Sequence, residues 1–398
     1  YTPAHHSPLF AELVCSNSLK AARLESAAGL LKAEMKRLGS LCVPIAETVA
    51  VPAGGALAVD RERFSGLITE KIRSHPLITV VETEVTALPT DGVTVVATGP
   101  LTADTLAAEI ASLCGSLHFY DAAAPIVSAE SVDMTAAFRA SRYDREESGA
   151  GDYINCPMNK EEYEAFYDAL IHAETAPLHA FDKLQVYEGC MPVEVLAKRG
   201  PDTLRFGPMK PVGLRDPRTG HRPWAVLQLR METADGTMYN LVGFQTNLKF
   251  GEQKRVFGMI PALKNAEFMR YGVMHRNTFL QSPGFLGADF AVKERPCLFF
   301  AGQMTGVEGY MESAASGLLA GINAARRVLG QPPLILPRET MIGALAGHVS
   351  TENADFQPMG ANFGILPPLP TPIRDKRQRY AALSARALEI LTQKKEDL

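Results

Sequence analysis

Hydrophobic and glycine positions between residues 296 and 328 follow the order of a strand, a loop and a helix. Residues 296–300 are almost entirely apolar and predict a buried strand. Three glycines follow between residues 302 and 309, and helical spacing begins at about Met311. The unpaired N–H groups and the dipole of such a helix favour a polar or negatively charged ligand at its start. The pattern therefore predicts a corner that can bind a ligand at the end of a strand.

The same helix carries small residues at every fourth position. Gly317, Gly321 and Ala325 lie on one face, which is almost without side chains. Such a face lets a backbone or a flat ligand come close. Tight packing of the helix on a sheet is the simpler explanation of this face, and contact with a ligand is the functional alternative.

A second strand with a similar ending lies earlier in the chain. Residues 93–100 are rich in β-branched side chains and end in Ala97, Thr98 and Gly99, before a helix predicted for residues 102–114. Two strands that each end in a small-residue turn before a helix indicate a doubly wound α/β sheet. In that fold the strand ends share a ligand crevice.

The remaining pattern predicts a mixture of helices and short strands. We expect strands at 48–51, 56–59 and 78–85, and mostly β structure from 186 to 250 with a hairpin at Asp235 and Gly236. We expect helices at 18–39, 64–74, 160–174, 255–265, 341–349 and 374–395.

A chain of 398 residues exceeds one ordinary hydrophobic core, so two domains are expected. The character of the chain changes near Ser128, where charged and β-rich segments begin. We predict a doubly wound, Rossmann-like domain from residues 1–127 and 286–335. An α+β insertion domain at 128–285 interrupts it, and a tail with a basic helix follows at 336–398.

Composition excludes several classes of protein. Hydrophobic residues make up 46% of the chain and charged residues 21%, as in ordinary soluble proteins. No apolar run is long enough to cross a bilayer, and the start shows no signal-peptide pattern. The six cysteines form no CxxC pair, which argues against a disulfide framework or a metal site and favours reduced thiols in a cytoplasmic compartment. A net charge of −4 leaves room for a local basic surface.

Two cysteines lie in settings that suit a reactive thiol. Cys190 follows Gly189, which permits a tight backbone, and a thiolate there can add to an electron-poor carbon such as C6 of a uracil. Cys15 lies in a turn before Ser16, where free backbone N–H groups favour a thiolate. A structural role is the alternative for both, and it is the commoner role of a single cysteine.

Basic and aromatic residues alternate in two segments. Residues 205–222 interleave cations with Gly, Pro and aromatic residues, as contacts to phosphates and splayed bases require. Residues 270–277 place aromatic rings and His275 between arginines, where they can stack on a heterocycle. The helix at 374–395 is also basic. Solvated loops and helix faces are the alternative for all three.

Seven long stretches occur together and in a fixed order. They are TPAHHSPLFAELVCSNSLK (2–20), YEGCMPVEV (187–195), GPMKPVGL (207–214), YNLVGFQTNLKFGEQKRVF (239–257), RYGVMHRNTF (270–279), LFFAGQMTGVEGYMESAASGLLAGINAAR (298–326) and FQPMGANFGILPPL (356–369). This combination resembles the folate- and FAD-dependent tRNA (uracil-5-)-methyltransferase family, relatives of the GidA-type tRNA-modifying flavoproteins. The resemblance covers nearly the whole chain.

The resemblance implies a reaction and its nucleophile. Cys190 resembles the cysteine that adds to uracil C6, and Cys15 resembles a second cysteine that removes the C5 proton. The implied substrate is a uridine in the T-arm of tRNA, presented out of the base stack. The implied carbon donor is 5,10-methylenetetrahydrofolate.

The resemblance also implies cofactors and the residues that hold them. FAD, reduced by NADPH or NADH, is the implied reductant, and His275 resembles a residue that stacks on the folate pterin. The implied flavin-binding positions are Gly302, Gln303, Thr305, Gly306, Glu308 and Gly309, together with Thr98 and Gly99. The resemblance leaves the oligomeric state open.

Members of this family begin with a strand, a GxGxxG loop and a helix that hold the FAD pyrophosphate. The sequence starts at Tyr1, without that segment, so we expect the sheet to lack its first strand. Two other interpretations stay open. One is a tRNA-binding module without catalysis; the other is a GidA-type enzyme acting on the wobble uridine, for which the tail is short.

Overall fold

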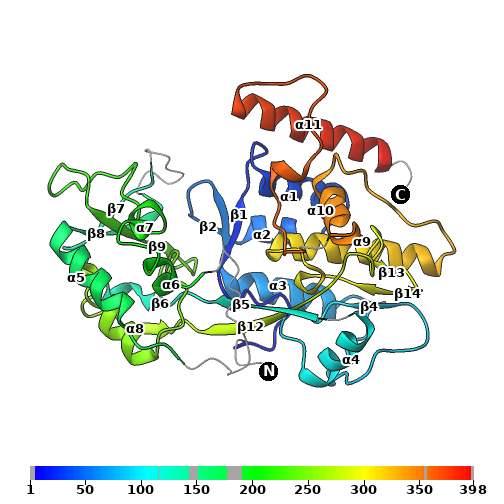
Figure 1. Cartoon of the computed structure of the whole chain (residues 1–398), viewed down its shortest axis with the longest axis horizontal. Coiled ribbons are helices and arrows are strands. Elements are labelled where there is room, and N and C mark those ends of the chain that lie inside the picture. Colours follow the sequence, from blue (N-terminus) through cyan, green and yellow to red (C-terminus); the bar gives the residue numbers. More distant parts are fainter. Residues whose placement is uncertain (1–4, 115, 143–150, 177–190, 354–355, 396–398) are drawn as a thin grey trace. The chain divides into compact units, whose positions relative to one another are not determined.

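The computed structural model describes residues 5–114, 116–142, 151–176, 191–353 and 356–395, which form a mixed α/β protein (Figure 1). The chain divides into two compact units, and each is assembled from three separate segments. The first unit comprises Tyr1–Ser18, Val49–Thr69 and Phe119–Arg276, and the second comprises Leu19–Thr48, Glu70–His118 and Asn277–Leu398.

Four elements contain points at which the chain passes from one unit to the other. They are β1 (Ser18–Ala21), α3 (Arg61–Arg73), β5 (Ser116–Ala122) and β12 (Met274–Leu280). The strands β5 and β12 pair with each other as a two-stranded ribbon.

A six-stranded antiparallel sheet forms the centre of the first unit, with the order β11-β6-β10-β9-β8-β7. Its members are β6 (Ile126–Ser128), β7 (Phe138–Arg139), β8 (Tyr153–Met158), β9 (Ala225–Met231), β10 (Met238–Leu241) and β11 (Phe268–Arg270). The predicted hairpin at Asp235 and Gly236 joins β9 to β10, and Gly236 has a φ of +69°. This unit also contains the short strands β2 (Ala50–Val51) and β3 (Ala56–Val59), within the ranges expected at 48–51 and 56–59, and they pair in antiparallel fashion.

The two faces of the six-stranded sheet differ in polarity. Leu227 and Leu229 of β9 face a hydrophobic core that also contains the aromatic side chains of α5 (Lys160–Ile171) and α8 (Phe250–Phe257). In that core Phe244 lies 6.1 Å from Phe166 and 5.2 Å from Phe257, centroid to centroid. Alternate residues of β9 point to the other face, where Gln228 and Arg230 are buried among polar side chains. The short helices α6 (Val193–Ala197) and α7 (Thr203–Phe206) complete the unit.

The second unit contains the strand, loop and helix predicted for residues 296–328. Strand β14 (Arg295–Phe300) pairs in parallel with β4 (Thr94–Val96) and in antiparallel fashion with β13 (Ala291–Val292). Helix α9 (Tyr310–Val328) follows β14 and buries Met311, Ala315 and Leu319. The other helices of this unit are α1 (Ala27–Arg37), α2 (Cys42–Thr48), α4 (Asp104–Cys114), α10 (Met341–Ser350) and α11 (Lys376–Lys395).

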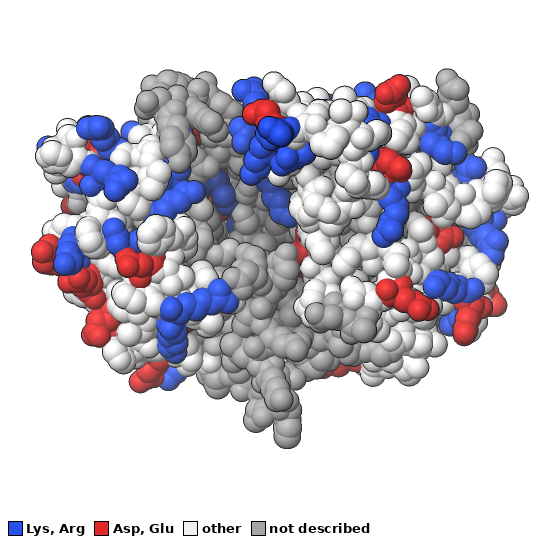
Figure 2. Space-filling view, turned by 45° about the horizontal axis from the view of Figure 1, so that its top comes forward, with Lys and Arg blue, Asp and Glu red and all other residues white. Residues whose placement is uncertain are grey.

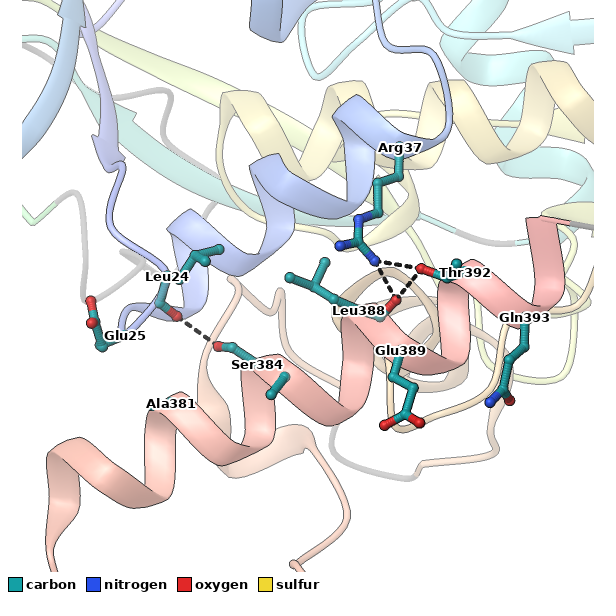
Figure 3. A pocket seen from close by; sticks show the side chains of 10 residues that line it. Leu24, Glu25, Arg37, Ala381, Ser384, Leu388, Glu389, Thr392 and Gln393 are labelled. Carbon is teal, nitrogen blue, oxygen red and sulfur yellow. Dashed lines mark hydrogen bonds between the residues drawn. The ribbon is translucent and has the colours of Figure 1, made fainter.

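The C-terminal helix α11 packs beside α1, and a groove of about 720 Å³ lies between them (Figure 3). Ser384 Oγ donates a hydrogen bond of 2.6 Å to the carbonyl of Leu24, and Arg37 Nη1 donates to Thr392 Oγ1 at 2.7 Å and to the carbonyl of Leu388. These contacts fix the start and the end of the shared surface (Figure 3).

Several local predictions are wrong. The helix predicted for 18–39 starts only at Ala27, where Ser26 accepts a hydrogen bond from the Gly29 N–H at 3.1 Å, and residues 18–21 form β1. Residues 193–197 and 203–206 are helical within a segment expected to be mostly β. Residues 78–85 form no strand, and their apolar side chains, such as Val81, are exposed. The face of α9 that carries Gly317 and Gly321 has no heavy atom within 4 Å of an added Cβ among the described residues, so it does not pack on the sheet.

Glu34 of α1 holds the start of α10. Its Oε1 and Oε2 accept hydrogen bonds from the N–H groups of Met341 at 2.7 Å and Ile342 at 2.9 Å. Burial raises the pKa of Glu34 from 4.5 to about 7, and the two backbone N–H groups oppose this shift only in part. The folded chain therefore keeps a proton that the unfolded chain releases. The stability gained from this proton is complete below about pH 4.5 and is lost as the pH rises through about 7.

We expect Glu34→Gln to remove this pH dependence, because an amide stays neutral at every pH. Between about pH 5 and about pH 8 the free energy of unfolding of the parent chain should fall by about 3 kcal/mol relative to that of the variant. Urea unfolding at several pH values measures the difference. The same pH dependence in both chains contradicts the role given to Glu34.

Candidate functional site

The loop between β14 and α9 has a backbone that requires glycine. Gly302 and Gly306 have φ values of +85° and +89°, in the left-handed region that other residues rarely occupy. At Gly306 a Cβ atom would collide with the ring of Phe356. At Gly302, by contrast, no heavy atom lies within 4 Å of an added Cβ, so the backbone there faces open space.

Side chains of the predicted flavin loop hold its shape by hydrogen bonds. Thr305 Oγ1 donates to the carbonyl of Gly302 at 2.8 Å, and the Gly302 N–H donates to Ser316 Oγ at 2.7 Å. Gln303 Nε2 donates to Glu308 Oε2 at 2.8 Å. Gly309, with a φ of +121°, is the N-cap of α9 and has no side chain to satisfy the first amides of that helix.

Thr98 and Gly99 follow the neighbouring strand, as predicted. The parallel pair β14 and β4 continues as a hydrogen bond of 2.9 Å from the Ala301 N–H to the Val96 carbonyl, so both turns lie at the same edge of the sheet. Thr98 Oγ1 lies 2.6 Å from Thr102 Oγ1 and 4.0 Å from Met304 Sδ. Gly99 has a φ of +77°.

An ion pair at the start of α9 was not predicted. Lys20 Nζ lies 2.6 Å from Glu312 Oε1, which also accepts a hydrogen bond from the Ala361 N–H at 3.0 Å. Lys20 Nζ also donates to the carbonyl of Glu308 at 3.4 Å, and Lys20 has a φ of +63°. Glu312 Oε2 is buried without a donor among the described residues. Lys20 and Glu312 belong to two of the long stretches quoted above, but sequence spacing does not reveal that they meet.

These residues fit the FAD that the resemblance implies. The turn after β14 exposes backbone at Gly302, lies beside the turn after β4, and precedes the N-terminus of a 19-residue helix. A dinucleotide needs an approachable backbone and a helix start at the ends of parallel strands. A Cβ at position 302 would occupy the open space that such a ligand requires.

Cys15 lies in the first unit, in a loop held on both sides by arginines. Arg61 Nη1 donates to the carbonyls of Leu13 and, at 3.2 Å, of Val14. Arg230 donates from Nε to Asn17 Oδ1 at 2.9 Å and from Nη2 to Ser16 Oγ at 2.8 Å. The sequence did not point to either arginine, because each lies far from Cys15 along the chain.

Cys190 lies outside the described residues, and so does the side chain of His275, whose backbone belongs to β12. The chain that follows Cys190 is firmly held. Glu194 is buried, and its two oxygens accept hydrogen bonds from Thr246 Oγ1 at 2.8 Å and from the Asn247 N–H at 2.7 Å. The Val193 N–H donates to the carbonyl of Gln245 at 2.7 Å.

A basic segment covers part of the first unit. Residues 198–224 contain seven Lys and Arg residues against two Asp, in a chain whose net charge is −4. Arg205 lies over the ring of Trp224 at 3.7 Å from its centroid, and Phe206 is 84% exposed. Figure 2 shows Lys and Arg side chains spread over the upper left of the view, the part of the molecule that carries α7 in Figure 1.

The residues that the structure describes contain neither a candidate metal cluster nor a candidate membrane-spanning helix. No group of three or more His, Cys, Asp or Glu side chains there is arranged to hold a metal ion. Within the same residues, no helix is both long and apolar enough to span a membrane.

Comparison with solved structures shows the fold. Two crystal forms of Aquifex aeolicus GidA superpose on the chain with TM-scores of 0.67 and 0.71, at 16% and 17% sequence identity. Each covers 97% of this chain, which corresponds to 70% and 69% of the GidA chain.

Comparison of sequences shows the family. The family model described as "Glucose inhibited division protein A" matches residues 2–332. The methylenetetrahydrofolate–tRNA-(uracil-5-)-methyltransferase TrmFO of Desulfitobacterium hafniense is 60% identical over 390 residues, which is 97% of this chain and 89% of the relative. The enzyme of the same name from Lactiplantibacillus plantarum is 58% identical over 399 residues, covering 100% of this chain and 90% of the relative. The chain therefore belongs to the GidA family, among its TrmFO-type members.

Proposed function

We propose that this chain methylates C5 of a uridine in the T-arm of tRNA, with methylenetetrahydrofolate as the carbon donor. The observation that carries the proposal is the identity of 55–60% over nearly the whole chain to relatives named for that reaction. A doubly wound FAD-binding domain, interrupted by an insertion at 128–285, is part of the same proposal. The parallel pair β14 and β4, followed by α9, supports it.

The reaction begins with a thiolate. Cys190 Sγ forms a bond to C6 of the uracil, and the displaced π electrons make C5 nucleophilic. C5 bonds to the methylene carbon as one of the bonds from that carbon to the donor's nitrogen atoms breaks. Cys15 takes the proton from C5, and the remaining carbon–nitrogen bond breaks to leave a methylene group on C5. Addition of a hydride to this carbon gives the methyl group, and expulsion of the Cys190 thiolate from C6 restores the ring. The hydrogen bonds of Val193 and Glu194 anchor the described chain that begins just after the nucleophile.

The residues around Gly302 and Thr98 would hold FAD. When bound and reduced by NADPH or NADH, FAD supplies the electron pair that converts the methylene carbon to a methyl group. Thr305 and Ser316 keep the backbone of Gly302 in the conformation that exposes it. Gln303 and Glu308 are locked to each other and maintain the shape of the loop before α9.

We expect Gly302→Ala to weaken flavin binding, because the added Cβ enters the open space at the loop and strains a φ of +85°. Gly330→Ala is the matched control. Gly330 has a φ of +69° and an equally open surrounding, but it follows the other end of α9. Visible absorbance of the purified chains, titrated with FAD, measures the effect. Equal flavin content in the two variants argues against this loop as the flavin site.

We expect Cys190→Ala to abolish 5-methyluridine formation and Cys15→Ala to slow it by about 10²–10⁴-fold, the range of a lost proton-transfer group. Flavin absorbance should stay unchanged in both. The exposed Cys297 provides the control, because Cys297→Ala removes a thiol outside the proposed chemistry. Mass spectrometry of digested tRNA measures the product. Undiminished methylation by Cys190→Ala would show that another group is the nucleophile.

The basic segment 198–224 supplies contacts that suit RNA. Buried Leu204, Met209 and Leu214 anchor it, while Lys210 and Arg222 are exposed. Cations of this kind contact phosphates, and the exposed ring of Phe206 offers a stacking surface for an unpaired base. This combination fits a tRNA arm that ends in a loop.

We expect Phe206→Ala to weaken binding of a T-arm stem-loop by about 1–3 kcal/mol, the usual contribution of one stacked base. Lys210→Ala should instead lower the slope of log affinity against log salt by about 0.7–0.9, because one phosphate contact is lost. Fluorescence anisotropy at several salt concentrations measures both. The control is Lys293→Ala, an exposed cation of the second unit. A slope equally reduced by Lys293→Ala would exclude a specific role for the basic segment.

A further inference from the structure

The buried Arg230 is the centre of a polar group that surrounds the Cys15 loop. It projects from β9, a central strand that pairs with β8 and β10, and its side chain is almost fully buried. Tyr153 of β8 and Asn240 of β10 are its cross-strand partners. A side chain on a central strand has little freedom, so it can fix the position of a loop that it contacts.

Arg230 contacts the two residues that follow Cys15 in the chain. Its Nε and Nη2 donate to Asn17 Oδ1 and Ser16 Oγ, the two side chains that follow the cysteine. Arg61 holds the other side through the carbonyls of Leu13 and Val14. The thiol therefore lies in a loop whose neighbours on both sides are tied to guanidinium groups.

The charges of the two arginines are balanced differently. Arg61 forms an ion pair with the buried Glu232, with an Nε–Oε2 distance of 2.6 Å. Within the described part of the chain, both hydrogen bonds of Arg230 go to neutral oxygen atoms. Burial lowers the pKa of Arg230, whereas the electrostatic influence of Glu232, Tyr153 and Cys15 raises it. A guanidinium stays charged even when buried, so this cation favours an anion nearby.

A further donor lies on the same sheet face. Asn240, opposite Arg230 on β10, is buried, and its Nδ2 has no acceptor among the described residues. Residues directly opposite each other in an antiparallel pair point to the same side. Arg230 and Asn240 thus place donors on the same face of the sheet, and donors stabilise a negative charge better than a neutral thiol.

We propose that Arg230 is a positioning residue for Cys15: it orients the Cys15 loop and stabilises the Cys15 thiolate, the form that accepts a proton. The inference rests on the proposed role of Cys15 in the methylation. The charged and titratable groups that act on Arg230 are Glu232, Tyr153, Arg61 and Cys15, and Glu232 also pairs with Arg61.

The test is the pH dependence of Cys15 alkylation in the full chain, followed by iodoacetamide labelling and peptide mass spectrometry. In Arg230→Gln the thiol should ionise at a pH about one unit higher, so that labelling at neutral pH slows by about 10-fold. Arg230→Lys keeps the charge but lacks the fork that reaches both Ser16 and Asn17. It should label like the parent chain and still methylate more slowly.

Arg139→Gln is the matched control, because Arg139 lies on β7 of the same sheet and donates to Tyr239 Oη at 3.0 Å, away from the Cys15 loop. Its Cys15 should label like that of the parent. Circular dichroism melts establish that each variant is folded. An unchanged labelling profile in folded Arg230→Gln overturns the proposal, and so does a slowed profile in Arg230→Lys. Labelling of Cys15 needs no tRNA. If the parent chain fails to methylate tRNA, the proposed function is contradicted, but the labelling result for Arg230 still holds.

Discussion

The buried amide of Asn17 makes the interaction on which the first unit depends. That unit is built from three segments of the chain, and Asn17, in the first segment, contacts the other two. Its Nδ2 donates to the carbonyl of Val59 at 3.0 Å and to that of Met231 at 2.8 Å, and its Oδ1 accepts from Arg230. Bringing three distant segments of the chain together costs conformational entropy. The polar groups where they meet must therefore form many hydrogen bonds and leave few donors and acceptors without partners. The reactive loop and the fold share this junction, because Cys15 lies two residues before Asn17.

Buried carboxylates have the same task elsewhere in the molecule. Glu34 holds the start of α10, Glu194 holds the chain beyond Cys190, and Glu232 holds Arg61. Each joins segments that are distant in sequence. Two of them bind backbone N–H groups, and Glu232 pairs with a cation. Burial raises the pKa of Glu34 and of Glu194, and the N–H groups oppose this rise only in part. The tertiary structure thus relies on charged or titratable groups in positions where apolar packing alone would not specify a single arrangement.

What could be predicted from sequence follows from the range of the interactions. The strand, loop and helix at 296–328 were predicted because their apolar and glycine positions reflect local geometry, and the structure has them as β14, the Gly302 loop and α9. The start of α1 was misplaced because β1 interrupts an apparent helical pattern. Residues 78–85 look like a strand, but a strand forms only where a partner edge is present. Thr98 was correctly placed near the loop, since both turns end neighbouring parallel strands. Lys20, Arg61 and Arg230 were missed because their partners lie far away in the sequence.

Lys20 illustrates how two demands on one residue limit its replacement. Its positive φ costs on the order of 1 kcal/mol, and glycine would relieve that cost. Glycine would also leave the buried carboxylate of Glu312 without its cation. The Lys20 side chain is 48% exposed, so water screens this pair and its loss costs less than the loss of a fully buried pair. The two effects oppose each other. Relaxing this left-handed residue to glycine therefore gains less stability than the backbone alone suggests, and the strain at position 20 accompanies a charge kept beside α9.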